Sequence, residues 1–158
     1  MHPPLAAFAF MSLKERVTED MKAAMRARDA ARLSAIRLLL AAMKQKEIDE
    51  RVELADADFL GVIDKMIKQR RESIAQYEKA GRSDLADAEK FEIGVLSAYL
   101  PQPMGESEIE QAVLAALSES GAAGVRDMGK VMALLKPRLA GRADMSKVSA
   151  LVKAKLGT

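Results

Sequence analysis

Two glutamates, Glu89 and Glu92, stand three residues apart, a spacing that places both carboxylates on one face of a helix. Paired carboxylates can do acid–base chemistry or bind a metal ion. The helix predicted just upstream offers Arg70 and Arg71 as counter-charges, and no histidine accompanies the acids. We therefore interpret Arg70, Arg71, Glu89 and Glu92 as a structural polar network. Arg70 falls on an apolar stripe, so its head either reaches water or an acid, or joins a buried network that orients helices.

The residue types needed for most catalytic sites are missing. The chain has no cysteine, and its only histidine is His2. This excludes disulfides and thiolate nucleophiles, and it argues against a histidine base or metal site. Gly129-Lys130 lacks the other glycines of a phosphate-binding loop. We predict no catalytic residue, metal, cofactor or small-molecule substrate, and the absence of cysteine favours a cytoplasmic protein.

Positive charge gathers at the end of the sequence. Residues 11–103 contain 17 basic and 17 acidic residues, whereas residues 124–158 contain eight basic residues against Asp127 and Asp144. A basic helical surface binds polyanions through phosphate contacts, although such a surface can also be a solvated face. No aromatic residue follows Tyr99, which argues against base stacking. The candidate nucleic-acid-binding residues are Lys130, Lys136, Arg138, Arg142, Lys147 and Lys153.

These residues must be positioned by helices. The sequence is 49% hydrophobic but only 4% aromatic, with strong helix formers throughout. Apolar spacing predicts helices over 12–28, 30–51, 57–80 and 85–99, forming an N-terminal bundle over 12–100. Ser12 and Glu15 form a capping-box pattern, and Asp56 is expected to cap the third helix. In the fourth helix the inward side chains are predicted to be Leu85, Phe91, Val95, Leu96 and Tyr99.

A second helical region follows a proline-bounded joint at 101–103, since Pro101 and Pro103 cannot continue a helix. Helices are predicted over 107–118 and 128–139, with a last helix after Asp144; Asp127 and Asp144 are expected to cap the last two. The predicted fold is therefore all-α, an N-terminal bundle of about four helices followed by a small basic three-helix tail domain over 104–158. Residues 1–11 are predicted to be a disordered extension, and no segment is apolar for long enough to span a membrane.

Several segments together resemble the YqeY family. They are YEKAGRSDLA at 77–86, then Glu89, Glu92 and YLP at 99–101, then DMGKVM at 127–132 and GRAD at 141–144. Leu33 to Leu40, with Arg37, fits the second helix of that family. The resemblance runs from about Met11 to Leu156, which is nearly the whole chain.

The resemblance carries an expectation about function. The YqeY family is related to the C-terminal part of the B subunit of the tRNA-dependent amidotransferase, where a helical appendage contacts tRNA. The tail domain of that subunit resembles this chain from about Met104 onward, and Lys130 and residues 141–144 match the part that faces tRNA. The catalytic cradle of the B subunit and the glutaminase subunit have no counterpart here. The resemblance therefore implies a carbon–nitrogen ligase label that this chain does not satisfy alone.

Three functions follow, in order of preference. The first is a non-catalytic tRNA-binding or tRNA-associated helical module. The second is a protein-interaction adaptor that docks on an amidotransferase or an aminoacyl-tRNA synthetase, favoured by the neutral, methionine-rich N-terminal region. The third is an amide-transfer enzyme, which the missing nucleotide and metal sites place last.

Overall fold

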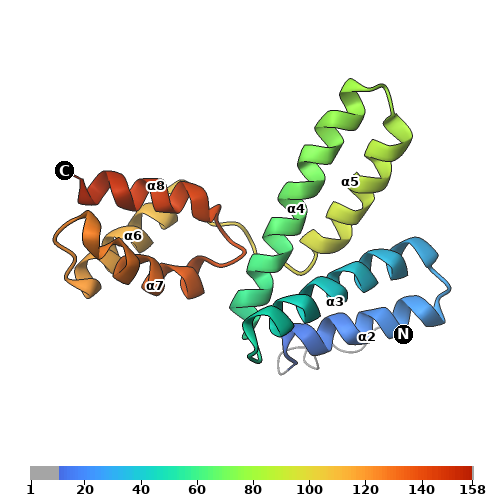
Figure 1. Cartoon of the computed structure of the whole chain (residues 1–158), viewed down its shortest axis with the longest axis horizontal. Coiled ribbons are helices and arrows are strands. Elements are labelled where there is room, and N and C mark those ends of the chain that lie inside the picture. Colours follow the sequence, from blue (N-terminus) through green and yellow to red (C-terminus); the bar gives the residue numbers. More distant parts are fainter. Residues whose placement is uncertain (1–10, 158) are drawn as a thin grey trace. The chain divides into compact units, whose positions relative to one another are not determined.

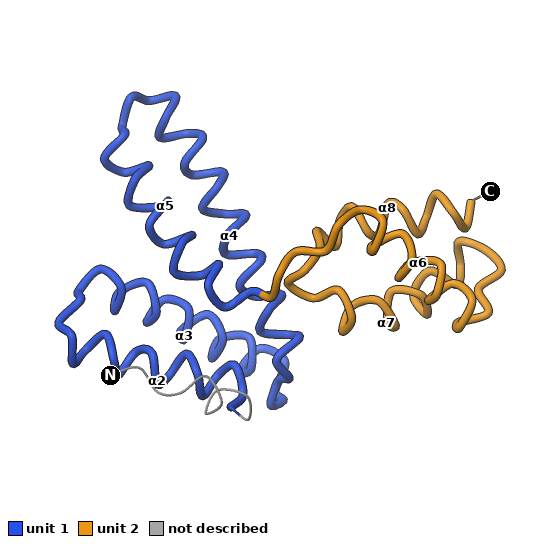
Figure 2. The backbone as a smooth tube through the Cα atoms, turned by 180° about the vertical axis from the view of Figure 1, so that it is seen from behind, with its two compact units in different colours: residues 1–100 blue, residues 101–158 orange. Residues whose placement is uncertain are grey.

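The computed structural model describes residues 11–157, and the predicted extension at 1–11 lies almost entirely outside them. The all-α prediction is confirmed, because the described residues form helices and turns and no strand. The chain divides into two compact units, Met1–Leu100 and Pro101–Thr158 (Figure 2). Each unit has its own apolar core.

The first unit consists of two helical hairpins (Figure 1). One hairpin pairs α2 (Leu13–Arg26) with α3 (Ala30–Glu50), and the other pairs α4 (Asp56–Lys79) with α5 (Ser83–Ser97). The hairpins meet where α3 passes into α4 and diverge toward their turns, which lie at separate free ends. Their shared core contains the fully buried side chains Val17, Ile36, Leu39, Met43, Phe59, Ile63 and Leu96.

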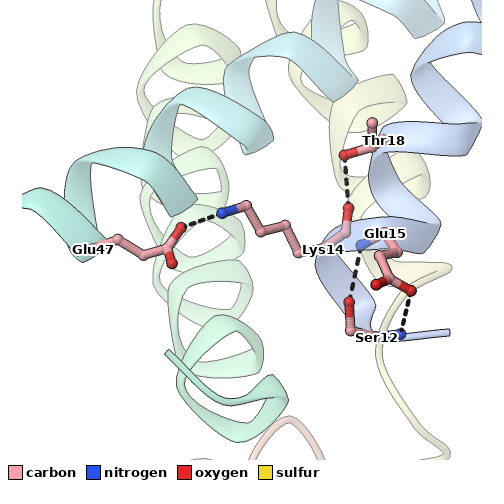
Figure 3. Close-up of polar contacts among 5 residues, drawn as sticks. All are labelled: Ser12, Lys14, Glu15, Thr18 and Glu47. Carbon is pink, nitrogen blue, oxygen red and sulfur yellow. Dashed lines mark hydrogen bonds and ion pairs between the residues drawn. The ribbon is translucent and has the colours of Figure 1, made fainter. Parts of the chain in front are cut away.

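Polar contacts fix the start of α2 (Figure 3). Ser12 Oγ accepts a hydrogen bond from the Glu15 amide at 3.2 Å, and Glu15 Oε2 accepts one from the Ser12 amide at 3.3 Å, so the predicted capping box is confirmed. The Lys14 ammonium lies 2.7 Å from Glu47 Oε1, which joins the start of α2 to the end of α3. This hydrogen bond holds the pKa of Glu47 below its ordinary value.

Asp56 does not cap α4, contrary to expectation. The helix begins at Asp56 itself, and Asp58 Oδ2 accepts the hydrogen bond from the Ala55 amide at 3.2 Å. Asp56 Oδ1 instead accepts from the Leu13 amide at 3.0 Å, which satisfies a free donor at the first turn of α2. The Asp56 carboxylate, predicted to cap α4, therefore accepts a hydrogen bond from the first turn of α2.

The two hairpin turns share one backbone motif but use different residues. At the end of α4, the amide of Gly81 donates to Glu78 O and that of Arg82 to Tyr77 O, with a Gly81 φ of 71°. This is the Schellman motif, in which a left-handed residue, usually glycine, ends the helix. The turn after α2 repeats it with Arg28 at the glycine position and a φ of 56°. An arginine in the left-handed region is disfavoured by about 1–2 kcal/mol.

Tyr99 fastens the end of α5 to α2. Its hydroxyl donates to Asp20 Oδ2 at 2.6 Å, and the Arg16 guanidinium lies 5.0 Å from the centre of its ring. Arg16 Nη2 also donates to Ala98 O at 3.2 Å. Burial, followed by the hydrogen bond to Asp20, raises the pKa of Tyr99 above its ordinary range, so the phenol stays neutral.

The second unit packs three helices, α6 (Glu106–Ser120), α7 (Met128–Leu139) and α8 (Met145–Leu156), with a 3₁₀ turn, η1 (Val125–Asp127), before α7 (Figure 1). Its core comprises Val113, Ala116, Val131, Leu135, Leu139, Val148 and Val152. Asp144 caps α8 as predicted, accepting from the Ser146 amide at 3.0 Å. Asp127 occupies the N-cap position of α7 as predicted, but its side chain makes no capping hydrogen bond, because its Oδ2 accepts from the Ala123 amide at 3.0 Å.

Candidate nucleic-acid interface

The paired glutamates of α5 lie opposite an arginine of α4. Arg70 Nε is 2.7 Å from Glu92 Oε2 and 4.0 Å from Glu89 Oε2, and Arg70 Nη1 donates to Met66 O at 3.3 Å. All three side chains are at most one-quarter exposed. Arg71 points into solvent instead, and no contact joins it to the two acids among the described residues. Arg70 thus binds the two carboxylates as their counter-charge and ties α4 to α5.

No catalytic constellation accompanies this pair. Within residues 11–157 no group of three acidic or histidine side chains is placed to hold a metal ion. A surface hollow of about 420 Å³ at the start of α2 is lined by Lys14, Glu15 and Thr18. Lys14 and Glu15 are already engaged, in the ion pair to Glu47 and in the capping box. A second hollow, of about 330 Å³, lies between α6 and α8 and has Ile109, Val148 and Leu151 among its lining residues.

Three basic residues of the second unit are engaged by glutamates of α6. Arg138 Nη2 lies 2.6 Å from Glu119 Oε2, and Lys155 Nζ lies 3.4 Å from Glu110 Oε1. Arg142 Nη2 lies 3.8 Å from Glu108 Oε2. Arg142 also has a structural role: its Nε donates to Gln102 O at 2.9 Å, and its carbonyl accepts from the Met104 amide at 2.9 Å. These contacts hold the proline-bounded joint segment against the turn between α7 and α8.

Four other predicted residues are presented to solvent. Lys130, Lys136, Lys147 and Lys153 are exposed, and no acid lies within ion-pair distance of them in the described part of the chain. Lys130 and Lys136 lie on α7, and Lys147 and Lys153 on α8. Residues six apart on a helix point about 120° apart. The lysines therefore spread over the solvent faces of α7 and α8 rather than forming a single row.

The charge of the second unit differs from that of its last two helices. Residues 124–158 carry eight basic and two acidic residues, but α6 adds Glu106, Glu108, Glu110 and Glu119. The unit from Pro101 onward therefore has eight basic and six acidic residues, a net charge of +2. The α6 glutamates pair with Arg138, Arg142 and Lys155. The four lysines are exposed and have no acidic partner among the described residues, so they form the positive surface. We call Lys130, Lys136, Lys147 and Lys153 the lysine face.

One cationic surface was missed in the sequence analysis. Residues 22–37 contain five basic residues and a single acid, Asp29, although the whole first unit is neutral. Asp29 is occupied as the N-cap of α3, where its Oδ1 accepts from the Arg32 amide at 3.1 Å. A charge count over a short window would have found this segment. The count over residues 11–103 conceals its positive charge, because acidic residues elsewhere in that range bring the net charge to zero.

A protein-family model matches nearly all of the described chain. A family model described as "Yqey-like protein" matches residues 14–156. The chain belongs to the Yqey-like protein family. This match shows the family that the resemblance of its motifs predicted.

Three fungal relatives share 32–39% of the aligned residues. "Altered inheritance of mitochondria protein 41, mitochondrial" from Eremothecium gossypii is 39% identical over 93 residues, which cover 58% of this chain and 51% of that protein. The protein of the same name from Lachancea thermotolerans is 37% identical over 114 residues, covering 70% of this chain and 61% of the relative. That of Pyrenophora tritici-repentis is 32% identical over 128 residues, covering 78% and 71%. The chain thus spans less than two thirds of the length of the first two relatives.

The expectation of a cytoplasmic protein is contradicted. The relatives from these three fungi are all named as mitochondrial proteins. The absence of cysteine was a poor basis for that expectation, because it is compatible with any compartment. In the described residues no helix is both long and apolar enough to cross a membrane.

Proposed function

We propose that the chain is a non-catalytic tRNA-binding module and that the lysine face of its second unit contacts the phosphate backbone. The observation that carries the proposal is the exposure of Lys130, Lys136, Lys147 and Lys153 without acidic partners in the described part of the chain. An exposed ammonium neutralises a phosphate and releases its counterions. The resemblance to the tRNA-contacting appendage of the amidotransferase B subunit supports tRNA as the polyanion.

The expected mode of binding follows from what surrounds the lysines. No aromatic side chain follows Tyr99, so the second unit has no platform on which bases could stack. Ammonium groups bind phosphates without reading base identity. Binding should therefore depend steeply on salt and discriminate little among tRNA sequences.

A mobility-shift titration of unfractionated tRNA at several salt concentrations tests the proposal. Affinity falls with salt, so the slope of log affinity against log salt is negative. Each lost phosphate contact should reduce the magnitude of that slope by about 0.7–0.9, and replacing all four lysines by glutamine should reduce it by about 3. The matched control replaces Lys44, Lys65, Arg71 and Lys79, exposed residues of the first unit, by glutamine, which removes the same net charge. Absence of binding at low salt, or equal slopes for the two quadruple variants, would refute the proposal.

A second candidate is the protein-interaction adaptor, docking on an amidotransferase or an aminoacyl-tRNA synthetase. It is favoured by Leu38 of α3 and Phe91 of α5, large apolar side chains that are 47% and 46% exposed on helices that pack together. Phe91 was predicted to lie inward, and that prediction is wrong because Val95, Leu96 and Tyr99 fill the inner face of this segment. Recovery of such an enzyme, free of RNA after nuclease treatment, is the measurement that would favour this candidate.

A further inference from the structure

The turn between α2 and α3 carries three arginines, Arg26, Arg28 and Arg32, which we call the arginine corner. Arg26 and Arg28 are exposed and Arg32 is half-buried. Within the described residues no acid lies within ion-pair distance of any of the three, and the only nearby acid in sequence, Asp29, serves as a helix cap. The turn lies at the free end of the first hairpin, away from the turn of the second (Figure 1). The corner is therefore a concentrated positive surface within a neutral unit.

Local structure explains the charge of Arg26 but not that of Arg28 or Arg32. Arg26 lies in the last turn of α2, where the helix dipole favours a cation. Arg28 occupies the left-handed position that Gly81 fills in the equivalent turn after α4. Arg32 lies in the first turn of α3, where the helix dipole disfavours a cation and where the capping carboxylate of Asp29 is the one acid, bonded to the Arg32 amide. Arginine is thus present at two positions where folding alone favours another residue.

The chemistry of the corner suits phosphate groups. A guanidinium presents a planar set of N–H donors that matches two oxygens of one phosphate, and it stays charged at any physiological pH. Three guanidiniums spread over seven residues of one turn can contact successive phosphates of one backbone. A structured RNA offers such a row of phosphates, whereas a single small anion would leave most of the corner unpaired.

We propose that the arginine corner is a second RNA-backbone contact, on the first unit, that acts together with the lysine face of the second unit. The proposal rests on the proposed function in taking tRNA as the bound RNA. Two cationic surfaces on one chain make the second contact intramolecular once the first has formed, which raises affinity without any new base-specific interaction. The first unit is then part of the RNA-binding surface rather than a neutral support for the tail.

The test compares salt slopes for unfractionated tRNA with the full chain. Replacing Arg26, Arg28 and Arg32 by glutamine should reduce the magnitude of the slope by about 2–3, since each lost phosphate contact removes about 0.7–0.9 from that magnitude. The matched control replaces Lys65, Arg71 and Lys79, which are exposed on α4 and remove the same charge from the same unit. Replacing the three corner residues by lysine keeps the charge and should keep the slope, and circular dichroism establishes that each variant is folded.

The outcomes separate this proposal from the one before it. If the corner variant and the α4 control give equal slopes, the corner is not an RNA contact, while the lysine face is unaffected by that result. If the salt dependence becomes shallower in the corner variant but not in the lysine-face variant, the corner is supported as an RNA contact and the proposed role of the lysine face fails. If the unmodified chain does not bind tRNA at low salt, both proposals fail. Loss of slope in the lysine-substituted variant would also overturn the corner, because a charge-based contact survives that substitution.

Discussion

The left-handed residue after α2 provides a direct test of whether arginine is kept there against its conformational preference. Arg28 and Gly81 occupy the same position of the same helix-ending motif, with φ values of 56° and 71°. We predict that Arg28→Gly gives a more stable protein than Arg28→Ala. Both substitutions remove the guanidinium, so their difference isolates the effect of the Cβ atom on the backbone. The reciprocal change, Gly81→Ala, should destabilise the protein by a similar amount.

The expected magnitude follows from two opposing terms. A residue with a Cβ in the left-handed region is disfavoured by about 1–2 kcal/mol. Glycine loses more chain entropy on folding, which offsets about 0.4–1 kcal/mol of that difference. The free energy of unfolding should therefore be about 0.5–1 kcal/mol larger for Arg28→Gly than for Arg28→Ala. No atom lies within 4 Å of a Cβ built at Gly81, so Gly81→Ala measures the conformational term without a clash.

Urea unfolding followed by circular dichroism gives the three free energies, and thermal unfolding should show shifts of about 2–8 °C for a unit of this size. Equal stability of the two Arg28 variants would show that the turn relaxes out of the left-handed region at no cost. In that case the conformational argument for a functional Arg28 would fail. If Gly81→Ala lowers the free energy of unfolding but the two Arg28 variants are equally stable, the two turns are not equivalent.

Two further predictions concern polar contacts of the first unit. Tyr99→Phe keeps the ring under the Arg16 guanidinium but removes the 2.6 Å hydrogen bond to Asp20, so the free energy of unfolding should fall by about 1.5–3 kcal/mol in urea titrations; an unchanged value would mean that water replaces the contact. Because Lys14 holds the pKa of Glu47 below its ordinary value of 4.5, the pair stabilises the fold above pH 4.5, and this contribution is lost as the pH falls through the lowered pKa. Lys14→Gln should therefore unfold at lower urea concentration at pH 7 and lose less stability between pH 5 and pH 3, as urea midpoints across that range would show.

The helices were predictable because their signals are local. Apolar residues at helical spacing, the Ser12 capping box and Gly81 all act within a few residues of their own position. The side-chain capping bonds predicted for Asp56 and Asp127 did not form, for the opposite reason: Asp56 lies one residue inside its helix, and Asp127 takes the N-cap position without the capping hydrogen bond. Both carboxylates found amide donors outside their own helices, at Leu13 and Ala123, and only the folded chain shows those donors.

The candidate interface was less predictable, because charge along a sequence is not charge on a surface. By charge alone, six residues after Gly124 were equal candidates, yet Arg138 is paired with Glu119 and Arg142 is bound to the joint segment. Their partners lie about 20 and 40 residues earlier in the chain, on elements that only packing brings close. Net charge and helical spacing did not separate the four lysines from the arginines. The absence of an acidic partner within the described residues did, since Arg138 is exposed as well but paired.

Pairing and exposure together explain how a nearly neutral chain can present two cationic surfaces. Several acids in this protein cap helices or join neighbouring helices: Asp29 and Asp144 cap, and Glu92 and Glu119 bind arginines of neighbouring helices. An acid engaged in a cap or an interhelical ion pair does not pair with other basic residues nearby. The basic residues beyond their reach, in the arginine corner and on the lysine face, then remain uncompensated although the net charge of the chain is only +2. Salt dependence is the property that follows from this arrangement, because it reports the number of local phosphate contacts and not the net charge.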